Sequence, residues 1–430
     1  MSGTATEKMR SHNPTLAMVL SIIFAGLGQL YNRRYAKGIT FIIIEAAFLI
    51  TFFEFLNIGY WGLFTLGEIP RVDHSIFLLI QGLISVIITV FAVALYYLNV
   101  VDARNNAIDL KLGKEKPTVK EALKNFYDNG FPYFMVIPGL ILLLFIVVLP
   151  LMFMVSLAFT DYNLYNTPPR ALLSWVGFEN FTSLVSIPLW KTTFVSVFAW
   201  TIVWTVCATT GQIALGLFLA LLVNDPRIKY KRFIRTILIL PWAVPAFVTI
   251  LIFAAMFNDR FGAINRDILG TIGVALPWLT DPFYTKIAII MIQTWLGFPF
   301  VFALFTGVLQ SISKDWYEAA DVDGGTRFQK FRFITMPHLL FATAPLLIMQ
   351  YAGNFNNFNI IYLFNQGGPA VRGQNAGGSD ILISWVYKLT FDTSNYNMAA
   401  AISIILGLIV AGFAFFQFRR TRSFKEEGNI

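Results

Sequence analysis

The chain has 430 residues, of which 57% are hydrophobic and only 13% are charged. A water-soluble domain carries about 25% charged residues, so this composition excludes an ordinary globular protein. The net charge of +8 does not indicate a nucleic-acid partner, because the lysines and arginines fall mainly in segments between long apolar runs. One cysteine and three widely separated histidines exclude a disulfide framework and predict no metal site.

Long apolar runs recur along the chain, each near the roughly 20 residues that a membrane-spanning helix needs. They predict an all-α polytopic membrane protein with about eight transmembrane helices, at 38–56, 76–99, 133–159, 193–223, 234–257, 285–310, 339–363 and 399–418. A further apolar run, from Leu16 to Leu30, is too short for an ordinary span and contains Gly26, Gly28 and Gln29. We expect it to form a short re-entrant or interfacial helix.

The positions of the basic residues predict the orientation of these spans. Of the 32 lysines and arginines, 24 fall in the segments assigned to one side and 8 in those assigned to the other. Because these residues concentrate in cytoplasmic loops, we expect both termini in the cytoplasm and residues 160–192 and 365–398 outside. No convincing cleavage site follows an apolar core near the N-terminus, so we expect that segment to be retained in the cytoplasmic membrane.

The longest polar segment on the predicted inner side, residues 100–131, separates two parts of the chain. Residues 1–130 are expected to form an N-terminal membrane region of the short helix, two spans and a cytoplasmic linker. Residues 131–430 are expected to form a six-helix core domain with a long loop at 311–338. The informative residues lie in this second part.

The loop at 311–338 has the pattern of two short amphipathic helices around a glycine turn. Trp316 and Tyr317 give the first helix an apolar face, and Gly324 and Gly325 can supply the turn because glycine tolerates positive φ. Pro337 stands at the entrance to the next span, where its missing N–H costs little. By periodicity alone, a helix pair lying on the membrane surface explains the pattern at least as well as a functional site.

The spacing of individual residues in this loop is more specific. Glu318-Ala319-Ala320 is followed after three residues by Gly324, after nine more by Ile334, and then by Met336-Pro337. The loop resembles the EAA motif of importer permeases of the ABC class, whose pattern is E-A-A, three residues, G, nine residues, I-x-L-P. Only Met336, in place of leucine, departs from it.

This resemblance implies a mechanical role for the loop. In the family it inserts into a cytoplasmic ATPase, where Glu318 would supply a charged contact, Gly324 the bend, and Ala319, Ala320, Ile334 and Pro337 the rest of the coupling surface. The chain has no G-x4-G-K-[ST] phosphate loop. We therefore expect a non-catalytic subunit that binds no cofactor, with ATP and magnesium held by a partner ABC ATPase dimer.

Within the ABC class the chain resembles the larger maltose/maltodextrin permease subunit over residues 130–420. The segments that show this resemblance are ILPWAVPAFVTILIFAAMFN at 239–258, QTWLGFPF at 293–300, NFNNFN at 354–359 and NQGGP at 365–369. The external segment 160–192 is short, whereas the enterobacterial subunit inserts a folded domain there. The resemblance implies a second EAA-type permease subunit, an extracytoplasmic sugar-binding protein and an oligosaccharide as partners, within membrane lipid and without nucleic acid.

Polar side chains in three predicted spans suit an uncharged sugar path. Gln350, Asn354 and Asn357 fall at i, i+4 and i+7, on one helical face, and Gln293, Gly297 and Phe300 have the same spacing in the preceding span. Trp242 and Ala246, four residues apart after Pro241, form a third such pair. Amides can donate to and accept from hydroxyls, although they also serve as interhelical contacts. In the maltose family, the positions that line the transmembrane sugar site match Trp242, Ala246, Gln293, Leu296, Gly297, Phe300, Gly353 and Asn357.

Only Leu296, Gly297 and Asn357 of these carry the family's typical residue, so an aromatic, amide-bearing cavity is expected but the identity of the sugar is open. Maltose or maltodextrin is the first expectation, with raffinose-type or isomalto-type sugars as alternatives. A secondary transporter is the rival from another class, but it would need buried ionisable residues in the core spans. A membrane enzyme would need a clustered acid, base or metal set, which the sequence does not show.

Overall fold

The computed structural model describes residues 13–113 and 119–420, and side chains are described for most but not all of them. Within residues 13–113 and 119–420 the chain is almost entirely helical. It has two isolated β-bridges there and no strand. The chain divides into two compact units, residues 1–176 and 177–430. Each unit is described below by itself.

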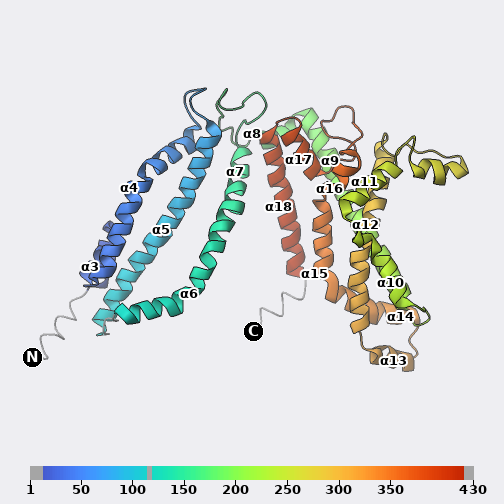
Figure 1. The fold of residues 1–430 in the computed structure, drawn as a ribbon, viewed down its shortest axis with the longest axis horizontal. Helices are drawn as coiled ribbons and strands as arrows, with labels where there is room; N and C mark the ends of the chain where they lie inside the picture. The colour runs from blue at the N-terminus through green and yellow to red at the C-terminus, as the bar shows by residue number, and fades with distance from the viewer. Residues whose placement is uncertain (1–12, 114–118, 421–430) are drawn as a thin grey trace, which may run out of the picture. The chain divides into compact units, whose positions relative to one another are not determined.

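The first unit contains the N-terminal helices and the spans that follow them (Figure 1). Its helices are α2 (Pro14–Ile23), α3 (Leu27–Tyr31), α4 (Tyr35–Thr65), α5 (Ser75–Lys111), α6 (Val119–Leu143) and α7 (Leu149–Leu157), with a π-helical turn at Leu144–Val148.

Small residues bring the two long helices α4 and α5 close together. Gly59 of α4 lies against Ser85 of α5, and Gly82 of α5 lies against Leu63 of α4. The Tyr60 and Thr89 hydroxyls hydrogen-bond at 2.7 Å. Without a hydrophobic force between helices in lipid, such close packing and interhelical hydrogen bonds are what hold spans together.

The short apolar run near the N-terminus folds as a helical hairpin. Helices α2 and α3 are joined by Phe24–Gly26, and the Asn13 amide N–H donates to the Tyr31 hydroxyl at 3.2 Å, so both ends of the hairpin meet. At the tip, the Ala25 amide donates to the Glu45 carboxylate, and the Tyr96 hydroxyl donates to the Ile22 carbonyl. The segment is thus a helical hairpin, and whether it re-enters the membrane or lies at its interface stays a prediction.

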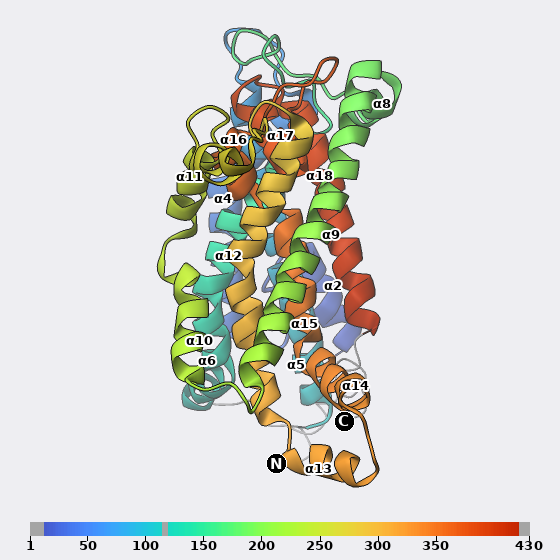
Figure 2. The same cartoon turned by 90° about the vertical axis from the view of Figure 1, so that its right-hand side faces the viewer.

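The second unit holds the remaining helices (Figure 2). They are α8 (Glu179–Ser186), α9 (Pro188–Asn224), α10 (Lys231–Ile239), α11 (Ala246–Met256), α12 (Pro282–Ser311), α13 (Lys314–Val322), α14 (Arg327–Lys330), α15 (Met336–Phe355), α16 (Phe358–Asn365), α17 (Leu382–Phe391) and α18 (Tyr396–Arg420). Short 3₁₀ or π segments lie at Leu240–Ala243, Ile264–Ile268, Leu269–Ile272 and Phe331–Thr335.

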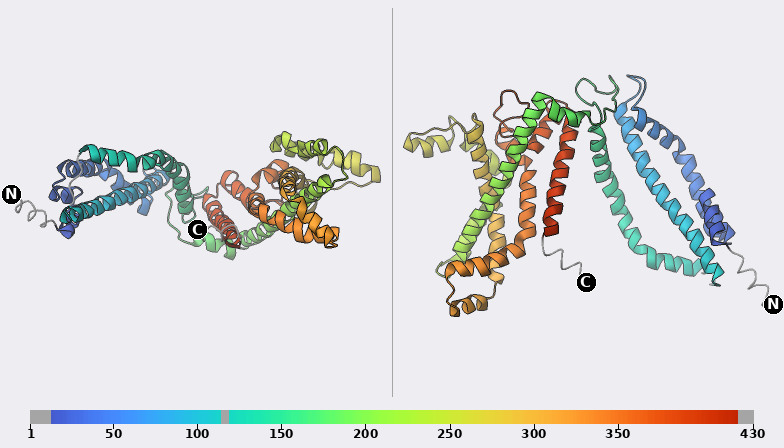
Figure 3. Two further views of the ribbon diagram at one scale, coloured as in Figure 1. Left: turned by 90° about the horizontal axis from the view of Figure 1, so that it is seen from below. Right: turned by 180° about the vertical axis from the view of Figure 1, so that it is seen from behind.

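Helices α9 and α12 lie side by side at the centre of the second unit, next to α15 (Figures 2 and 3). Near one end of the pair Phe298, Val301 and Phe302 of α12 are buried in a core that includes Ala220 of α9. At the other end the buried Trp204 of α9 and Ile289 of α12 share a second core with Phe364 of α16. The central pair is therefore the scaffold on which the other helices of this unit are placed.

Within the described residues, seven helices are long and apolar enough to cross a membrane, or eight if one bent pair is a single span. This confirms the expected all-α polytopic fold with about eight spans. The expected span 234–257 is not straight, however: α10 with its 3₁₀ extension and α11 meet at 86°. Pro241 and Pro245 flank the break, and each lacks the N–H that a continuous helix would use there.

The expected domain boundary at residue 130 falls inside α6. This boundary decides which spans are assigned to the permease domain, and it stays a prediction.

Candidate functional site

The loop between α12 and α15 forms the two short helices that the sequence predicts. The Ser313 hydroxyl accepts from the Asp315 amide and begins α13, and a Thr326–Gln329 capping box begins α14. Gly324 has φ +76°, in the left-handed region, and nothing lies within 4 Å of where a Cβ would stand. The glycine turn is thus confirmed, and it is required by backbone conformation and not by crowding.

Three contacts between its two arms fix the shape of this loop. The Tyr317 hydroxyl hydrogen-bonds the Thr335 hydroxyl at 2.9 Å, and Lys330 forms an ion pair with Asp321 at 2.6 Å. The Trp316 ring meets the His338 ring edge-on, with centroids 5.1 Å apart. The loop is therefore braced by contacts between its two arms.

The residues of the expected coupling motif lie on the outside of the loop. Glu318 and Ala319 are exposed, as is Gly324. Ile334 and Pro337 line an open cavity of about 390 Å³ with Trp316, Phe333, His338 and Phe341. Exposed apolar side chains around a hollow, next to an exposed carboxylate, are typical of a protein-docking surface.

The neighbouring loop after α9 is strongly charged. The Arg227 guanidinium, which hydrogen-bonds Asp225 at 2.7 Å, holds the pKa of that carboxyl far below its ordinary range, and the charge of Arg327 on α14 adds to this effect. Asp225 is therefore ionised at any physiological pH.

A closed network of amides ties α9, α12 and α15 together in the middle of the second unit. The Gln212 amide on α9 donates to the Gln293 carbonyl at 3.0 Å, and the Gln293 side chain donates to Asn354 Oδ1 at 2.9 Å. Asn354 in turn donates to the Thr209 hydroxyl at 2.8 Å and to Gln212 Oε1 at 3.2 Å. Gln212 and Asn354 are both buried, so this network is an interhelical contact.

The same network explains why position 297 is a glycine. A Cβ on Gly297 would stand 2.3 Å from the Gln212 amide carbon, a distance that no real contact allows. Its lack of a side chain lets α9 approach α12 and lets Gln212 reach Gln293. In this structure Gln293 and Gly297 therefore serve helix packing.

Two of the expected sugar-site aromatics lie together. Trp242, in the 3₁₀ turn before the break, and Phe300 of α12 have ring centroids 5.9 Å apart, and Trp242 is 53% exposed. Leu296, half-buried, packs against the core of the central helix pair. Ala246 and Gly353 are exposed, and nothing lies within 4 Å of a Cβ placed on Gly353.

Two expectations about shared helical faces are wrong. Helix α15 ends at Phe355 and α16 begins at Phe358, so Asn357, with ψ 80°, does not continue the face of Gln350 and Asn354. Trp242 and Ala246 are separated by the 86° break and are not one turn apart on a helix. Asn357 is half-buried, beside the interruption between α15 and α16. Whether these residues bind sugar stays a prediction.

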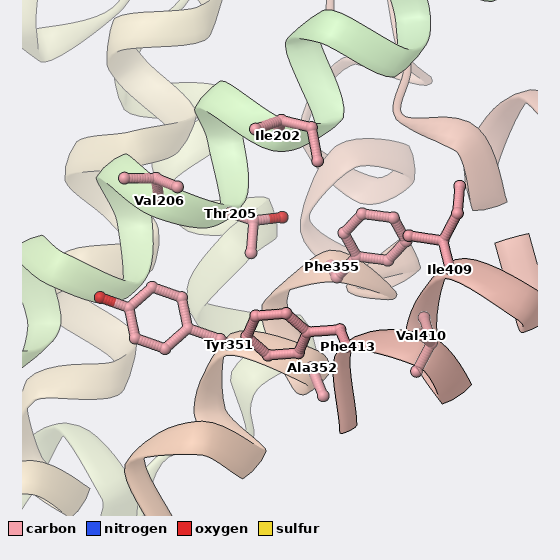
Figure 4. A pocket seen from close by; sticks show the side chains of 9 residues that line it. All are labelled: Ile202, Thr205, Val206, Tyr351, Ala352, Phe355, Ile409, Val410 and Phe413. Atoms are coloured by element: carbon pink, nitrogen blue, oxygen red, sulfur yellow. The ribbon is translucent and has the colours of Figure 1, made fainter. Parts of the chain in front are cut away.

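A pocket of about 200 Å³ lies between α9, α15 and α18, and none of the expected site residues lines it (Figure 4). Its walls are apolar except for two hydroxyls. The Thr205 hydroxyl already donates to the Thr201 carbonyl at 2.7 Å, and the Tyr351 hydroxyl is bonded to Thr210 at 2.9 Å. The pocket therefore offers few groups to a polyhydroxyl cargo.

The NQGGP segment forms a braced turn after α16. Gly367 has φ +71°, and a Cβ on it would collide with the Asp380 carboxylate. Asp380 is buried, forms an ion pair with Lys388 at 2.6 Å and accepts from the Ser384 hydroxyl at 2.8 Å. Burial raises the pKa of Asp380, opposed by Lys388. The motif thus holds a loop in a defined shape.

Sequence reasoning missed the partners contributed by α9. Thr209 and Gln212 stand three residues apart on the face that carries Thr205, a polar stripe in an apolar span that could have been noticed. Trp204, fully buried, donates its indole N–H to the Asn354 carbonyl at 2.8 Å. These residues complete the network that Gln293 and Asn354 begin.

Comparison with known proteins agrees with the coupling loop. Residues 212–423 match the model of the family "binding-protein-dependent transport system inner membrane component". The chain is 52% identical over 414 residues to a galactooligosaccharide transport system permease of Bacillus subtilis, covering 96% of this chain and 99% of that one. The chain belongs to this permease family.

Other relatives agree in class and differ in the sugar they are named for. A maltodextrin permease of Bacillus subtilis is 46% identical, with 96% of each chain covered. A maltose/maltodextrin permease of Vibrio vulnificus is 36% identical over 60% of this chain and 50% of its own length.

Among solved structures, a chain of a bacterial ABC transporter that imports alginate matches with a TM-score of 0.58 and 22% identity, over 70% of this chain and 98% of that one. This match shows the permease fold. Family membership makes the chain a multi-pass transport subunit of an ABC importer and not a catalytic one.

Proposed function

We propose that this permease carries an uncharged oligosaccharide across the cytoplasmic membrane, driven by an ABC ATPase dimer that docks on the α13–α14 loop. A second EAA-type permease subunit completes the path, and an extracytoplasmic sugar-binding protein delivers the cargo. The observation that carries the proposal is the loop itself, with Glu318 exposed, Gly324 in the left-handed region and Ile334 and Pro337 lining an open apolar hollow.

The orientation that this proposal needs agrees with the basic residues. With 24 of 32 lysines and arginines on the side of the α13–α14 loop, that loop and both termini lie in the cytoplasm. Single cysteines in a Cys207→Ala background, labelled on intact cells with an impermeant reagent, test this. Labelling at Val322 from outside would overturn the orientation.

The role of the loop is tested by one substitution made at two places. Gly324→Val and Gly273→Val both put a β-branched residue at a positive-φ glycine with free space around it, φ +76° and +71°. The backbone penalty, about 1–2 kcal/mol, is therefore similar at the two sites. Gly273 lies in the segment between α11 and α12, on the predicted outer side.

We expect Gly324→Val to abolish sugar-stimulated ATP hydrolysis and uptake by the assembled transporter, while capture of sugar by the binding protein is unchanged. Gly273→Val should retain most transport. Wild-type transport by Gly324→Val, or equal losses in the two variants, would show that the loop does not couple the subunits.

The cargo has two candidates of the same chemical class. Maltodextrin follows from the resemblance in sequence motifs, and a galactooligosaccharide is favoured by the 52% identical relative. Trp242 and Phe300, whose rings lie next to each other at a tilt of 37° and are partly exposed, suit the apolar face of either sugar ring, and Asn357 suits its hydroxyls. Uptake of labelled maltotriose and of a labelled galactosyl trisaccharide, each competed by the other, decides between them.

The sugar site itself is tested at Asn357 and Phe300. Asn357→Leu removes a donor and an acceptor and should weaken transport by the equivalent of about 1–3 kcal/mol. Asn356→Leu, at the exposed neighbouring amide, is the matched control. Normal uptake in both Asn357→Leu and Phe300→Ala would remove these residues from the path and leave the importer assignment intact.

A further inference from the structure

A cavity of about 600 Å³ in the first unit has no role in the proposed transport mechanism. It is formed by α4, α5 and the tip of the α2–α3 hairpin, with Phe41, Phe48, Leu49, Ala92 and Leu95 among its apolar walls. The polar groups that line it are Lys37, Glu45, Tyr96, Asn99 and Asp102. The cavity therefore combines a long apolar surface with a few charged and amide groups.

The polar groups and the apolar walls are arranged along the cavity. Lys37 and Asp102 form an ion pair at 2.6 Å, where α4 begins and α5 approaches its end. From Lys37 to Leu49, α4 rises about 18 Å at 1.5 Å per residue. No residue of the most apolar stretch of α4 is buried within the described part of the chain. One end of the cavity thus lies near a membrane surface, and the rest extends into the hydrocarbon region.

The charged side chains are the groups of the lining that a bound molecule can reach. Lys37 and Asp102 are 43% and 27% exposed. Glu45 is half-buried and accepts from the Ala25 amide. The side-chain nitrogen and oxygen of Asn99 lack a hydrogen-bond partner but are buried, so they are not open to the cavity.

The charges select the kind of molecule. Two carboxylates, Glu45 and Asp102, and one ammonium, Lys37, line the cavity, so its lining carries excess negative charge. An anionic headgroup alone would be repelled, whereas a headgroup with its own ammonium can pair with a carboxylate. The phosphate of such a headgroup can accept from Lys37.

We propose that this cavity binds a phospholipid with a primary ammonium headgroup, of the phosphatidylethanolamine type, from the membrane leaflet next to Lys37. Its ammonium pairs with Asp102 or Glu45, its phosphate accepts from Lys37, and one acyl chain lies along Phe41, Phe48 and Leu49. With the orientation proposed above, this is the cytoplasmic leaflet. The site is independent of the coupling loop and of the sugar path.

The test uses the assembled transporter in vesicles of equal parts phosphatidylethanolamine and phosphatidylglycerol. Each lipid is supplied in turn as a tracer with a photoreactive acyl chain, and labelled peptides are located by mass spectrometry. We expect the phosphatidylethanolamine tracer to label α4 between 41 and 49 and α5 between 92 and 98, more strongly than the phosphatidylglycerol tracer does.

Two tryptophan substitutions of α5 give a matched pair. Ala92→Trp fills the cavity and should lower labelling by the phosphatidylethanolamine tracer about tenfold, the ratio that corresponds to 1.4 kcal/mol. Ala94→Trp, two residues further along the helix and outside the lining, should leave it unchanged. If Ala92→Trp does not assemble, Leu49→Trp fills the cavity from α4.

Glu45→Gln separates headgroup recognition from acyl-chain contact, because both lipids carry a phosphate and only phosphatidylethanolamine carries an ammonium. It should reduce the excess labelling by the phosphatidylethanolamine tracer while the apolar walls remain. Equal labelling by both tracers in the unsubstituted protein, or unchanged labelling in Ala92→Trp, would show an ordinary annular lipid and overturn the proposal. A photoreactive residue at Val93 that cross-links to another subunit, and not to lipid, would also overturn it.

Discussion

Two buried polar clusters, one in each unit, differ in whether their amides are satisfied. In the second unit, Gln212 and Asn354 use both their donors and their acceptors on partners from α9, α12 and α15. In the first unit, Gln29 is satisfied, but the buried Asn99 beside it has no side-chain partner.

The difference shows that a polar residue in a span is not by itself evidence of a binding site. A closed cluster contributes to helix packing, because every group that leaves water gains a partner. An open cluster keeps a buried amide without hydrogen-bond partners, which costs stability. The amides first noticed in the sequence belong mainly to the closed cluster.

The largest expected effect comes from a side chain that is too large for the space in the closed cluster. Gly297→Val places carbon atoms where the Gln212 amide lies, so α9 and α12 must separate. We expect a loss of folded, monodisperse protein in detergent, since overpacking of this severity costs about 1–3 kcal/mol or more. Gly307→Val, on the same helix with nothing within 4 Å of its Cβ position, should fold normally. Equal behaviour of the two variants would show that the close approach is not needed.

The next effect removes hydrogen bonds from the closed cluster at nearly constant volume. Asn354→Leu leaves Gln293, Thr209 and Gln212 with unpaired groups, so the free energy of unfolding should fall by about 1–3 kcal/mol. The measurement is the midpoint of thermal unfolding of the purified subunit, with Asn356→Leu as control. An unchanged midpoint for Asn354→Leu would mean that the network contributes nothing to stability.

A smaller effect is expected from the satisfied member of the open cluster. Gln29→Leu removes the bonds to Asp102, to the Asn99 carbonyl and from the Ser21 hydroxyl. Asp102 keeps Lys37 and Asn106, so the loss should be about 1 kcal/mol. Limited proteolysis of the α2–α3 hairpin reports this change directly. Protection equal to that of the unsubstituted protein would contradict it.

The smallest effect carries the opposite sign. Asn99→Leu, measured in lipid-free detergent, should leave the unfolding midpoint unchanged or raise it, because the asparagine amide there is buried without partners. The same Asn-to-Leu change thus lowers stability in one cluster and does not in the other. A clear loss at Asn99 would mean that it has a partner in the lipid-free protein, and the contrast between the clusters would fail.

The parts of the fold that depend on local chemistry were predictable from the sequence. The spans follow from apolar length, and the loop around Gly324 follows from helix periodicity and a residue that tolerates positive φ. The break at Pro241 and Pro245 had a local signal, two prolines, but its angle of 86° is set by packing. The interruption at Asn356 has no proline and gave no such signal.

The candidate sugar site was less predictable because its contacts are distant in sequence. Gln293 and Asn354 look alike as polar groups in two spans, but their partners Thr209 and Gln212 lie on a third helix more than 80 residues earlier than either. A helical-face argument finds residues on one helix and cannot show which neighbour they meet. The same limit hid the cavity of the first unit, which joins three segments.

The α2–α3 hairpin also constrains how the protein is made. Its two ends meet at the hydrogen bond between Asn13 and Tyr31. Gln29 and Asn32, both fully buried, find their partners at Asn99, Asp102 and Ala103 of α5. Those partners leave the ribosome some 70 residues after the hairpin does. The hairpin can therefore complete its polar contacts only after α5 has been made, and it cannot reach its final packing as soon as it is synthesised.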